Sequence, residues 1–293
     1  MQIVKKTITN VFYHIFFRLD LQQLEKIQCK LLWYRLRLQE LIRRKEATIK
    51  GDIKPPILLN KNQALNRSIL DSNADWHTLD VSTCQIPGML TKSEKQYYEY
   101  ISQTYSGIGE VVELGPWLGA STKILLNGLA KNRSFDNKKL HVYDDFVWRD
   151  SWMEKWLQGT DIKPPGNYES FLPIFEEIHR QELSKLNITK AKIADYDGNE
   201  SLEQIEWIGT PIEIMIVDCG RQLHVNEAWW QIFNSSFIPD RTLIVMQDWQ
   251  NHKAVPEIYW ENTKIFTDSK EGRLDLIHEV HNAGIATFIY RNH

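Results

Sequence analysis

Residues 111–122 have the sequence VVELGPWLGAST, in which an apolar run leads into a turn with two glycines and then into a helix that we expect to begin near Ser121. This order of strand, turn and helix is typical of the first unit of a ligand-binding α/β domain. Glycine suits Gly115 and Gly119 because the backbone must turn sharply there and a ligand can approach where no Cβ stands. The free amides of the first helical turn would then face an anionic group of the ligand.

Trp117 lies at the centre of this turn, in the pattern E-x-G-x-x-x-G. A dinucleotide-binding loop carries further glycines so that a pyrophosphate can press against the backbone, and the indole would hinder that contact. The loop therefore argues against a nicotinamide dinucleotide. A glycine turn after a strand also occurs in α/β proteins that bind nothing at that point, so the loop alone leaves several cofactors open.

Two adjacent acids, Asp144 and Asp145, follow the next apolar run, residues 140–143. A carboxylate at the carboxyl end of the second strand can accept hydrogen bonds from both hydroxyls of a ribose. We expect Asp144 to do so, although a pair of acids in a turn can also be merely solvated. Together with the glycine turn, this acid favours a ligand that contains adenosine.

The remaining apolar runs predict a mainly parallel sheet covered by helices on both faces, because they are short and separated by helical stretches. Strands are expected at residues 110–114, 140–143, 191–194, 212–217, 242–247, 274–280 and 285–290. Helices are expected at residues 92–104, 121–130, 168–186, 225–234 and 255–266, and a capping box of Thr91 and Glu94 opens the first of them. The last two strands are joined by four residues, so they must be antiparallel, since a parallel pair needs a crossover of about a dozen residues.

The chain of 293 residues is long enough for one α/β domain and an additional segment. Residues 1–48 predict a basic helical arm, with an apolar face repeating along residues 11–47. Residues 49–74 predict a linker, which leaves residues 75–293 for the domain. The first 50 residues carry a net charge of +7 and the rest −10, so the arm is open to homodimer formation, to contact with a membrane surface and to packing on the domain.

The composition limits the cellular compartment and the partners that we expect for the chain. Its three cysteines, Cys29, Cys84 and Cys219, are too dispersed to predict a disulfide framework or a zinc site. The apolar run at residues 11–17 is too short to span a membrane. We therefore expect a cytoplasmic protein, with peripheral membrane contact as an alternative. The net charge of −3 gives no reason to expect nucleic acid as a partner.

With these features the chain resembles the class I S-adenosylmethionine-dependent methyltransferases, and among them the macrocin-type sugar O-methyltransferases. The resemblance covers residues 85–291 and rests on VVELGPWLGAST, HVYDDF, IEIMIVDCGRQ, TLIVMQDW and the terminal hairpin. It implies a Rossmann-like α/β fold with a seven-stranded, mainly parallel sheet, and S-adenosylmethionine as cofactor. The cofactor contacts it implies are Glu113, Gly115, Pro116, Trp117, Gly119, Ser121 and Asp144, with adenine held beside Asp195 or Tyr196.

Strands four and five are expected to end at Asp218 and Asp248, on the edge where open α/β sheets bind ligands. Methyl transfer is an in-line displacement on an activated sulfonium, so the protein must align the acceptor and remove its proton. Asp218 and Asp248 are the first candidates for that base. His224 and His252 follow them, because a single histidine near a strand end is more often a surface or packed residue.

The resemblance also implies a metal between the strand-four aspartate and paired acids after strand five. Here Asp248 is followed by Trp249, so one ligand is missing, and Arg221 stands in a segment that is rich in acids and histidine in the relatives. Two carboxylates and waters can hold Mg²⁺, but we do not favour a metal and name no ligands for one.

Several tryptophans lie near the strand ends in the sequence, and indoles can stack on sugar rings or adenine, although we prefer core or helix-sheet packing for any one of them. These are Trp148, Trp152, Trp156, Trp229, Trp230 and Trp249. The sequence thus favours a methyltransferase acting on a sugar hydroxyl or another small-molecule or glycan acceptor. A non-catalytic S-adenosylmethionine-binding or scaffold protein would have the same loop, and a nicotinamide-dependent oxidoreductase is less favoured.

Overall fold

A computed structural model describes residues 42, 75–194, 205, 207, 210–254 and 258–291. Ile42 is helical and is the only residue of the expected arm among them. The predictions for the rest of the arm, for the linker and for Asp195 lie outside the described residues. None of the described helices is long and apolar enough to span a bilayer.

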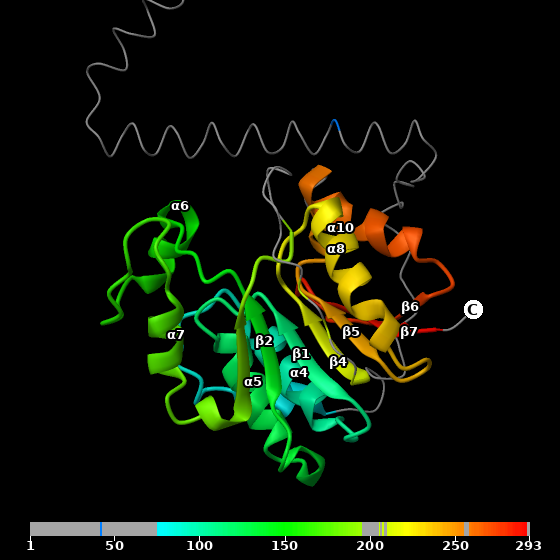
Figure 1. Ribbon diagram of the computed structural model, residues 1–293, viewed down its shortest axis with the longest axis horizontal. Coiled ribbons are helices and arrows are strands. Elements are labelled where there is room, and N and C mark those ends of the chain that lie inside the picture. The colour runs from blue at the N-terminus through cyan, green and yellow to red at the C-terminus, as the bar shows by residue number, and fades with distance from the viewer. Residues whose placement is uncertain are drawn as a thin grey trace, which may run out of the picture.

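Seven strands form one sheet in the order β3-β2-β1-β4-β5-β7-β6 (Figure 1). They are β1 (Glu110–Leu114), β2 (Leu140–Asp144), β3 (Leu186–Lys190), β4 (Ile212–Val217), β5 (Leu243–Met246), β6 (Leu274–Glu279) and β7 (Ala286–Tyr290). The first five run parallel, whereas β7 is antiparallel to both β5 and β6. The predicted fold class, a Rossmann-like sheet closed by an antiparallel hairpin, is confirmed.

The strand order explains where a ligand can enter. The chain proceeds from β1 to β2 and β3 on one side, and then returns to β4 on the other side of β1. Loops that leave β1 and β4 therefore diverge, and the carboxyl edge between these two strands is the topological switch point of the sheet. Both strands are buried at every residue, which is why their sequences, EVVEL and IEIMIV, are mainly apolar.

The third strand is the one that sequence reasoning placed wrongly. It spans Leu186–Lys190, whereas residues 191–194 were expected. Among the described strands β3 pairs with β2 alone, and polar residues such as Asn187 alternate with its apolar ones, so no apolar run marks it. The expected helix at residues 168–186 shrinks accordingly to α7 (Leu172–Ile178). Asp195 therefore does not follow the end of β3 directly.

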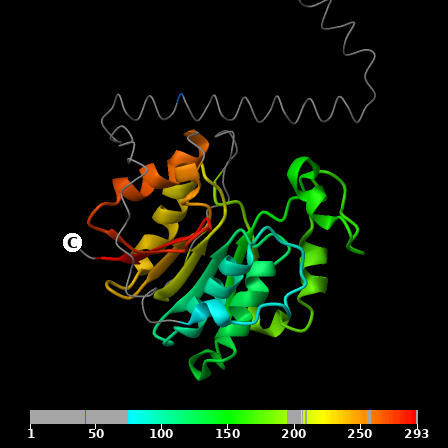
Figure 2. The ribbon, with the colours of Figure 1, turned by 180° about the vertical axis from the view of Figure 1, so that it is seen from behind.

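Helices cover both faces of the sheet (Figures 1 and 2). They are α4 (Lys92–Gln103), α5 (Ala120–Leu129), α6 (Asp150–Met153), α8 (Leu223–Phe233), α9 (Asn251–Ala254) and α10 (Ile258–Ser269), besides α7. Alternate strand residues belong to two cores: Val111 packs with residues of α4 and α5, and its neighbour Val112 packs with residues of α8 and α10. The single turns α6 and α9 have too few residues for a periodic pattern and were not predicted.

The capping box predicted for α4 is confirmed. The amide of Glu94 donates to Thr91 Oγ1 at 3.3 Å, and the Thr91 amide donates back to Glu94 Oε2 at 2.7 Å. The other oxygen of the same carboxylate accepts from the Gly284 amide at 3.0 Å and from Gln247 Nε2 at 2.9 Å. One buried side chain thus joins the start of α4 to the end of β5 and to the hairpin loop.

Candidate functional site

The segments that follow β1, β2, β4 and β5 are joined by backbone hydrogen bonds at the carboxyl edge of the sheet. Gly115 N donates to Tyr143 O at 2.8 Å, Asp218 N to Leu114 O at 2.9 Å, and Gln247 N to Val217 O at 3.0 Å. This continuous edge carries four of the acids that the sequence singled out, one at the end of each strand: Glu113, Asp144, Asp218 and Asp248.

Both loop glycines have left-handed backbone angles, with φ of +81° at Gly115 and +86° at Gly119. A Cβ on Gly115 would lie 2.5 Å from the carbonyl oxygen of Asp218, and a Cβ on Gly119 would overlap Nε2 of His179 on the segment after α7. The space that each missing Cβ leaves is therefore filled by the chain itself. The sequence explains these glycines by a sharp turn and by room for a ligand. The structure adds a third reason, which is the close packing of neighbouring segments.

Trp117 has its indole in an aromatic group beside the loop. Its ring lies 6.4 Å from that of Trp148, stacked on it, and 6.5 Å from that of Trp152. Indole Nε1 is buried and has no hydrogen-bond partner among the described residues. The backbone φ of +50° places Trp117 in a region that tryptophan rarely adopts, and such outliers gather at ligand sites.

Glu113 is the most deeply buried acid of the edge, with 1% of its surface exposed. Its Oε2 accepts from Thr122 Oγ1 at 2.6 Å, but its Oε1 is buried and lacks a hydrogen-bond partner within the described part of the chain. Burial raises the pKa of Glu113 to about 7, while the hydroxyls of Ser121 and Thr122 lower it. An unpaired buried carboxylate oxygen is an acceptor for a cationic N–H group.

Asp144 lies on the neighbouring strand end and turns its carboxylate toward the β1 loop. Its Oδ1 accepts from the amide of Phe146 at 2.6 Å, and its Oδ2 lies 3.4 Å from the amide of Trp117. Burial, and after it the neighbouring charge of Asp145, raise the pKa of Asp144 to about 7. In the loop after β1, Pro116 lies between Gly115 and Trp117 and is buried. Its carbonyl oxygen accepts from Gly119 N at 2.9 Å, which closes the turn.

Arg221 joins Asp218 and Asp248. Its Nη2 donates to Asp218 Oδ1 at 2.8 Å and also to Asp248 Oδ2, and its guanidinium lies 6.0 Å from the ring centre of Trp260. Burial raises the pKa of Asp218 to about 8, against the lowering effect of Arg221. Sequence reasoning did not give Arg221 a role, although its position three residues after the strand-four aspartate was a signal for it.

The two candidate histidines differ in their surroundings. His224 lies in the first turn of α8 and is half-buried. His252 lies on α9, where its Nδ1 is 2.5 Å from Trp249 O and its ring packs against the Trp249 indole. Burial lowers the pKa of His252. Its ring is thus held by Trp249, and none of its described contacts reaches Asp218 or Asp248.

The tryptophans separate into two groups. Trp148, Trp229, Trp230 and Trp249 are buried in the core. Trp152 and Trp156, on α6 and the turn after it, remain 39% and 40% exposed. Because Trp152 also contacts Trp117, the exposed pair extends the aromatic group beside the turn between β1 and α5 toward solvent.

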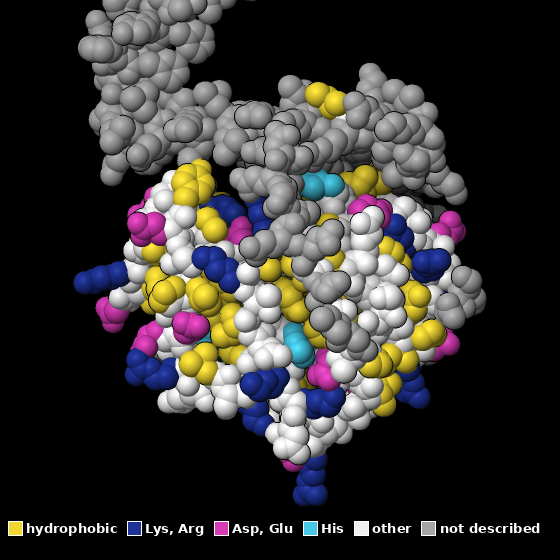
Figure 3. All heavy atoms as spheres, in the orientation of Figure 1, with side chains coloured by type: hydrophobic (Ala, Val, Ile, Leu, Met, Phe, Trp, Pro, Cys, Tyr) yellow, Lys and Arg dark blue, Asp and Glu magenta, His cyan; other side chains and the backbone are white. Residues whose placement is uncertain are grey.

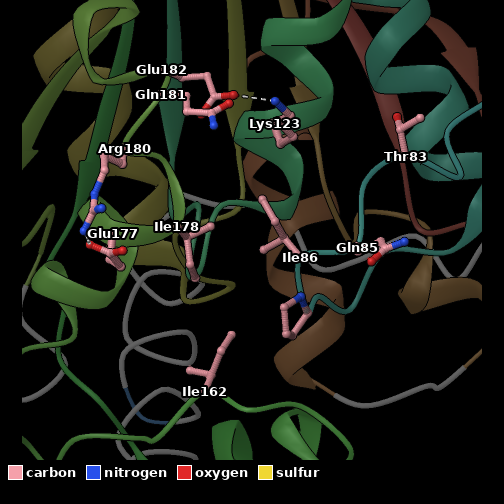
Figure 4. A pocket seen from close by; sticks show the side chains of 11 residues that line it. Thr83, Gln85, Ile86, Lys123, Ile162, Glu177, Ile178, Arg180, Gln181 and Glu182 are labelled. Carbon is pink, nitrogen blue, oxygen red and sulfur yellow. Dashed lines mark hydrogen bonds and ion pairs between the residues drawn. The ribbon is translucent and has the colours of Figure 1, made fainter.

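A cavity of about 570 Å³ lies between α5, α7 and the segment before α4 (Figure 4). Ile86, Ile162 and Ile178 surround it, and the ion pair of Lys123 with Glu182 stands at its rim. None of the site residues predicted from the sequence and described by the structure lines this cavity. It is therefore separate from the acidic edge.

No family model matches the chain, and no curated protein is significantly similar to it in sequence. Solved structures that resemble it include the O-methyltransferase NovP, at 11% identity and a TM-score of 0.46, covering 70% of this chain and 83% of that one. An O-methyltransferase from Bacillus cereus in complex with SAH has 12% identity and a TM-score of 0.43, with coverages of 71% and 86%. TomG from Streptomyces achromogenes, in complex with SAM, has 11% identity and a TM-score of 0.42, with coverages of 70% and 82%. These likenesses concern the fold alone.

Proposed function

We propose that the chain binds S-adenosylmethionine at the turn between β1 and α5 and transfers its methyl group to a small-molecule acceptor. The observation that carries the proposal is the buried Glu113 carboxylate at the switch point of the sheet, whose Oε1 has no hydrogen-bond partner among the described residues. Leaving a buried acceptor unpaired costs about 1–3 kcal/mol, which a ligand ammonium would offset. The amino group of the methionine part supplies such a donor.

The charge of the edge supports a cationic cofactor over a dinucleotide. Asp218 has Asp248, Glu113 and Glu94 near enough to raise its pKa. A pyrophosphate would add negative charge to acids whose pKa values are already raised, whereas the sulfonium and ammonium of S-adenosylmethionine would stabilise their ionised forms. Asp144, at the end of β2, has the position from which a carboxylate accepts hydrogen bonds from the ribose hydroxyls.

Asp218 is the proposed base. During transfer, the acceptor oxygen forms a bond to the methyl carbon while the carbon–sulfur bond breaks and its electron pair stays on sulfur. The acceptor proton passes to the carboxylate of Asp218, and S-adenosylhomocysteine is released. A pKa near neutrality suits a group that must take up a proton during the reaction.

The acceptor is proposed to lie against the exposed aromatic side chains beyond the cofactor loop. Trp152 and Trp156 present flat apolar rings to solvent, and Tyr168, in the segment that leads to α7, is 58% exposed. Rings of this kind stack on the apolar faces of sugars and of aromatic small molecules. A sugar hydroxyl or a related small-molecule hydroxyl is therefore the proposed methyl acceptor.

Calorimetry with S-adenosylhomocysteine tests the cofactor. We expect micromolar binding that is lost in Asp144→Ala and in Gly115→Arg, whose side chain would meet the turn after β4. Asp136→Ala is the matched control, because Asp136 is an exposed aspartate shortly before the opposite end of β2. Tight binding of NAD(H) in place of S-adenosylhomocysteine would refute the assignment.

A further inference from the structure

Two carboxylates that end neighbouring parallel strands face each other across one guanidinium. Asp218 and Asp248 follow β4 and β5, and both accept hydrogen bonds from the same nitrogen of Arg221, its Nη2. The three side chains are largely shielded from solvent, with 29%, 24% and 19% of the side-chain surface exposed. A pairing shielded in this way is screened less by solvent and salt than an ion pair on the surface.

The backbone around this pairing is fixed. Asp248 has a left-handed φ of +60°, and a Cβ on Gly284 would lie 3.1 Å from both Cα and Oδ1 of Asp248. The amide of Gln250 donates to Gly284 O at 2.9 Å, so the hairpin loop is held against this turn. The hairpin loop thus fixes the backbone from which the Asp248 carboxylate reaches Arg221.

A divalent cation does not fit between these carboxylates. Mg²⁺ takes oxygen ligands at about 2.0–2.1 Å in an octahedron, and the two oxygens that face each other here are both engaged by Arg221. An ion beside the guanidinium would also be repelled by its charge. In the described ranges, no group of three His, Cys, Asp or Glu side chains is arranged to hold a metal.

We propose that the guanidinium of Arg221 is the built-in cation of this site, occupying the place between Asp218 and Asp248 in which a divalent ion would otherwise bind. The consequence for catalysis rests on the proposed function: methyl transfer proceeds without a metal ion, and Arg221 acts as a positioning residue that holds Asp218. Arginine suits this role because it stays protonated at all physiological pH values and offers several donors in one plane.

Binding of Mn²⁺ to the full chain, followed by electron paramagnetic resonance, tests the proposal without any methyl acceptor. Wild-type protein treated with a chelator is expected to bind no Mn²⁺ at micromolar concentrations. In Arg221→Met the two carboxylates lose their cation, so the affinity for Mn²⁺ should rise at least tenfold, and Mn²⁺ should raise the Tm of this variant alone. Arg221→Lys keeps the charge and should resemble the wild type.

Arg291→Met is the matched control, because Arg291 also bridges two aspartates, Asp240 and Asp275, far along the sheet from the site. Their side chains are 68% and 49% exposed, so removing Arg291 should create no Mn²⁺ site.

Two results would overturn the proposal. One is micromolar binding of Mn²⁺ to the wild type that disappears in Asp218→Asn, and the other is a folded Arg221→Met that gains no affinity for Mn²⁺. Should Arg221→Met not fold, Arg221→Gln replaces it, because this substitution also removes the charge and keeps a hydrogen-bond donor. Failure of the proposed methyl transfer would leave all of these binding results unaffected.

Discussion

The pKa of Asp218 results from opposing electrostatic effects. Burial and the nearby acids raise its pKa, whereas Arg221 lowers it, and the resulting pKa is about 8. A carboxylate of ordinary pKa would be a weak base toward a hydroxyl, and a fully neutralised one could not accept a proton at all. The arginine therefore keeps Asp218 close to the range in which general-base catalysis is effective.

Replacing Asp218 by Asn should lower the rate of methyl transfer by about 10²–10⁴-fold, the usual contribution of a general base, and leave the affinity for S-adenosylhomocysteine nearly intact. Asp248→Asn should also lower the rate, because Asp248 holds Arg221. Since the base acts only when deprotonated, kcat of the wild type should increase with pH until about pH 8. Steady-state kinetics with labelled cofactor measure both effects. Unchanged rates in both variants would remove these residues from the mechanism.

Glu113 should make the stability of the wild type depend on pH. Its pKa is raised from 4.5 to about 7, so the folded state favours the protonated carboxyl. This contribution is fully present below about pH 4.5 and is lost as the pH rises through 7, by about 3 kcal/mol at most. Glu113→Gln cannot ionise, so its free energy of unfolding relative to the wild type should be higher at pH 8 than at pH 5.

Urea unfolding at the two pH values measures this difference. Glu177→Gln on α7 is the control, because that carboxylate is 63% exposed and should give the same small difference at both pH values. An equal effect of Glu113→Gln at pH 5 and pH 8 would show that Glu113 is ionised throughout.

At the scale of elements, the sequence predicted what depends on local pattern and missed what depends on distant neighbours. The strands β1 and β4 are buried on both faces and are mainly apolar in sequence, so they were predicted correctly. The strand β3 has no such apolar sequence. The pairing of Arg221 with Asp248 joins residues 27 positions apart, and it exists only because β4 and β5 are adjacent. No local pattern contains that information.

The start of α5 depends on a contact of this distant kind. A Cβ on Gly119 would overlap His179 Nε2 and approach Phe175 to 2.8 Å, and φ there is +86°. Gly119→Ala should therefore lower the free energy of unfolding by more than the 1–2 kcal/mol that a left-handed alanine costs. His179→Ala should relieve part of the excess in the double variant. Chemical denaturation of both single variants and the double variant measures this coupling, and strictly additive effects would show that the helix start does not press on His179.

At the scale of the whole molecule, buried polar contacts tie the acidic edge to the rest of the domain. Tyr98 on α4 donates to Gln247 Oε1 at 2.7 Å, and Gln247 in turn donates to Glu94. The residue after Gln247 is Asp248, so the helix that opens the domain helps to position the proposed site. On the outer surface, Lys and Arg side chains are interspersed with Asp and Glu in the view of Figure 3.

Charge is distributed unevenly along the chain. The first 50 residues carry a net charge of +7, whereas the remaining residues carry a net charge of −10. We expect this arm to pair with a second copy of the chain, to bind an anionic membrane or to pack on the domain, and among the two intermolecular contacts the membrane one is weakened more strongly by salt. Deleting residues 1–48 should therefore abolish dimers in sedimentation velocity, or abolish cosedimentation with vesicles that contain phosphatidylserine. Neutral vesicles are the control. The affinity for S-adenosylhomocysteine should not change, because every residue proposed to contact the cofactor lies beyond residue 110. A deletion that alters neither property but weakens S-adenosylhomocysteine binding would show that the arm packs on the domain and supports the site.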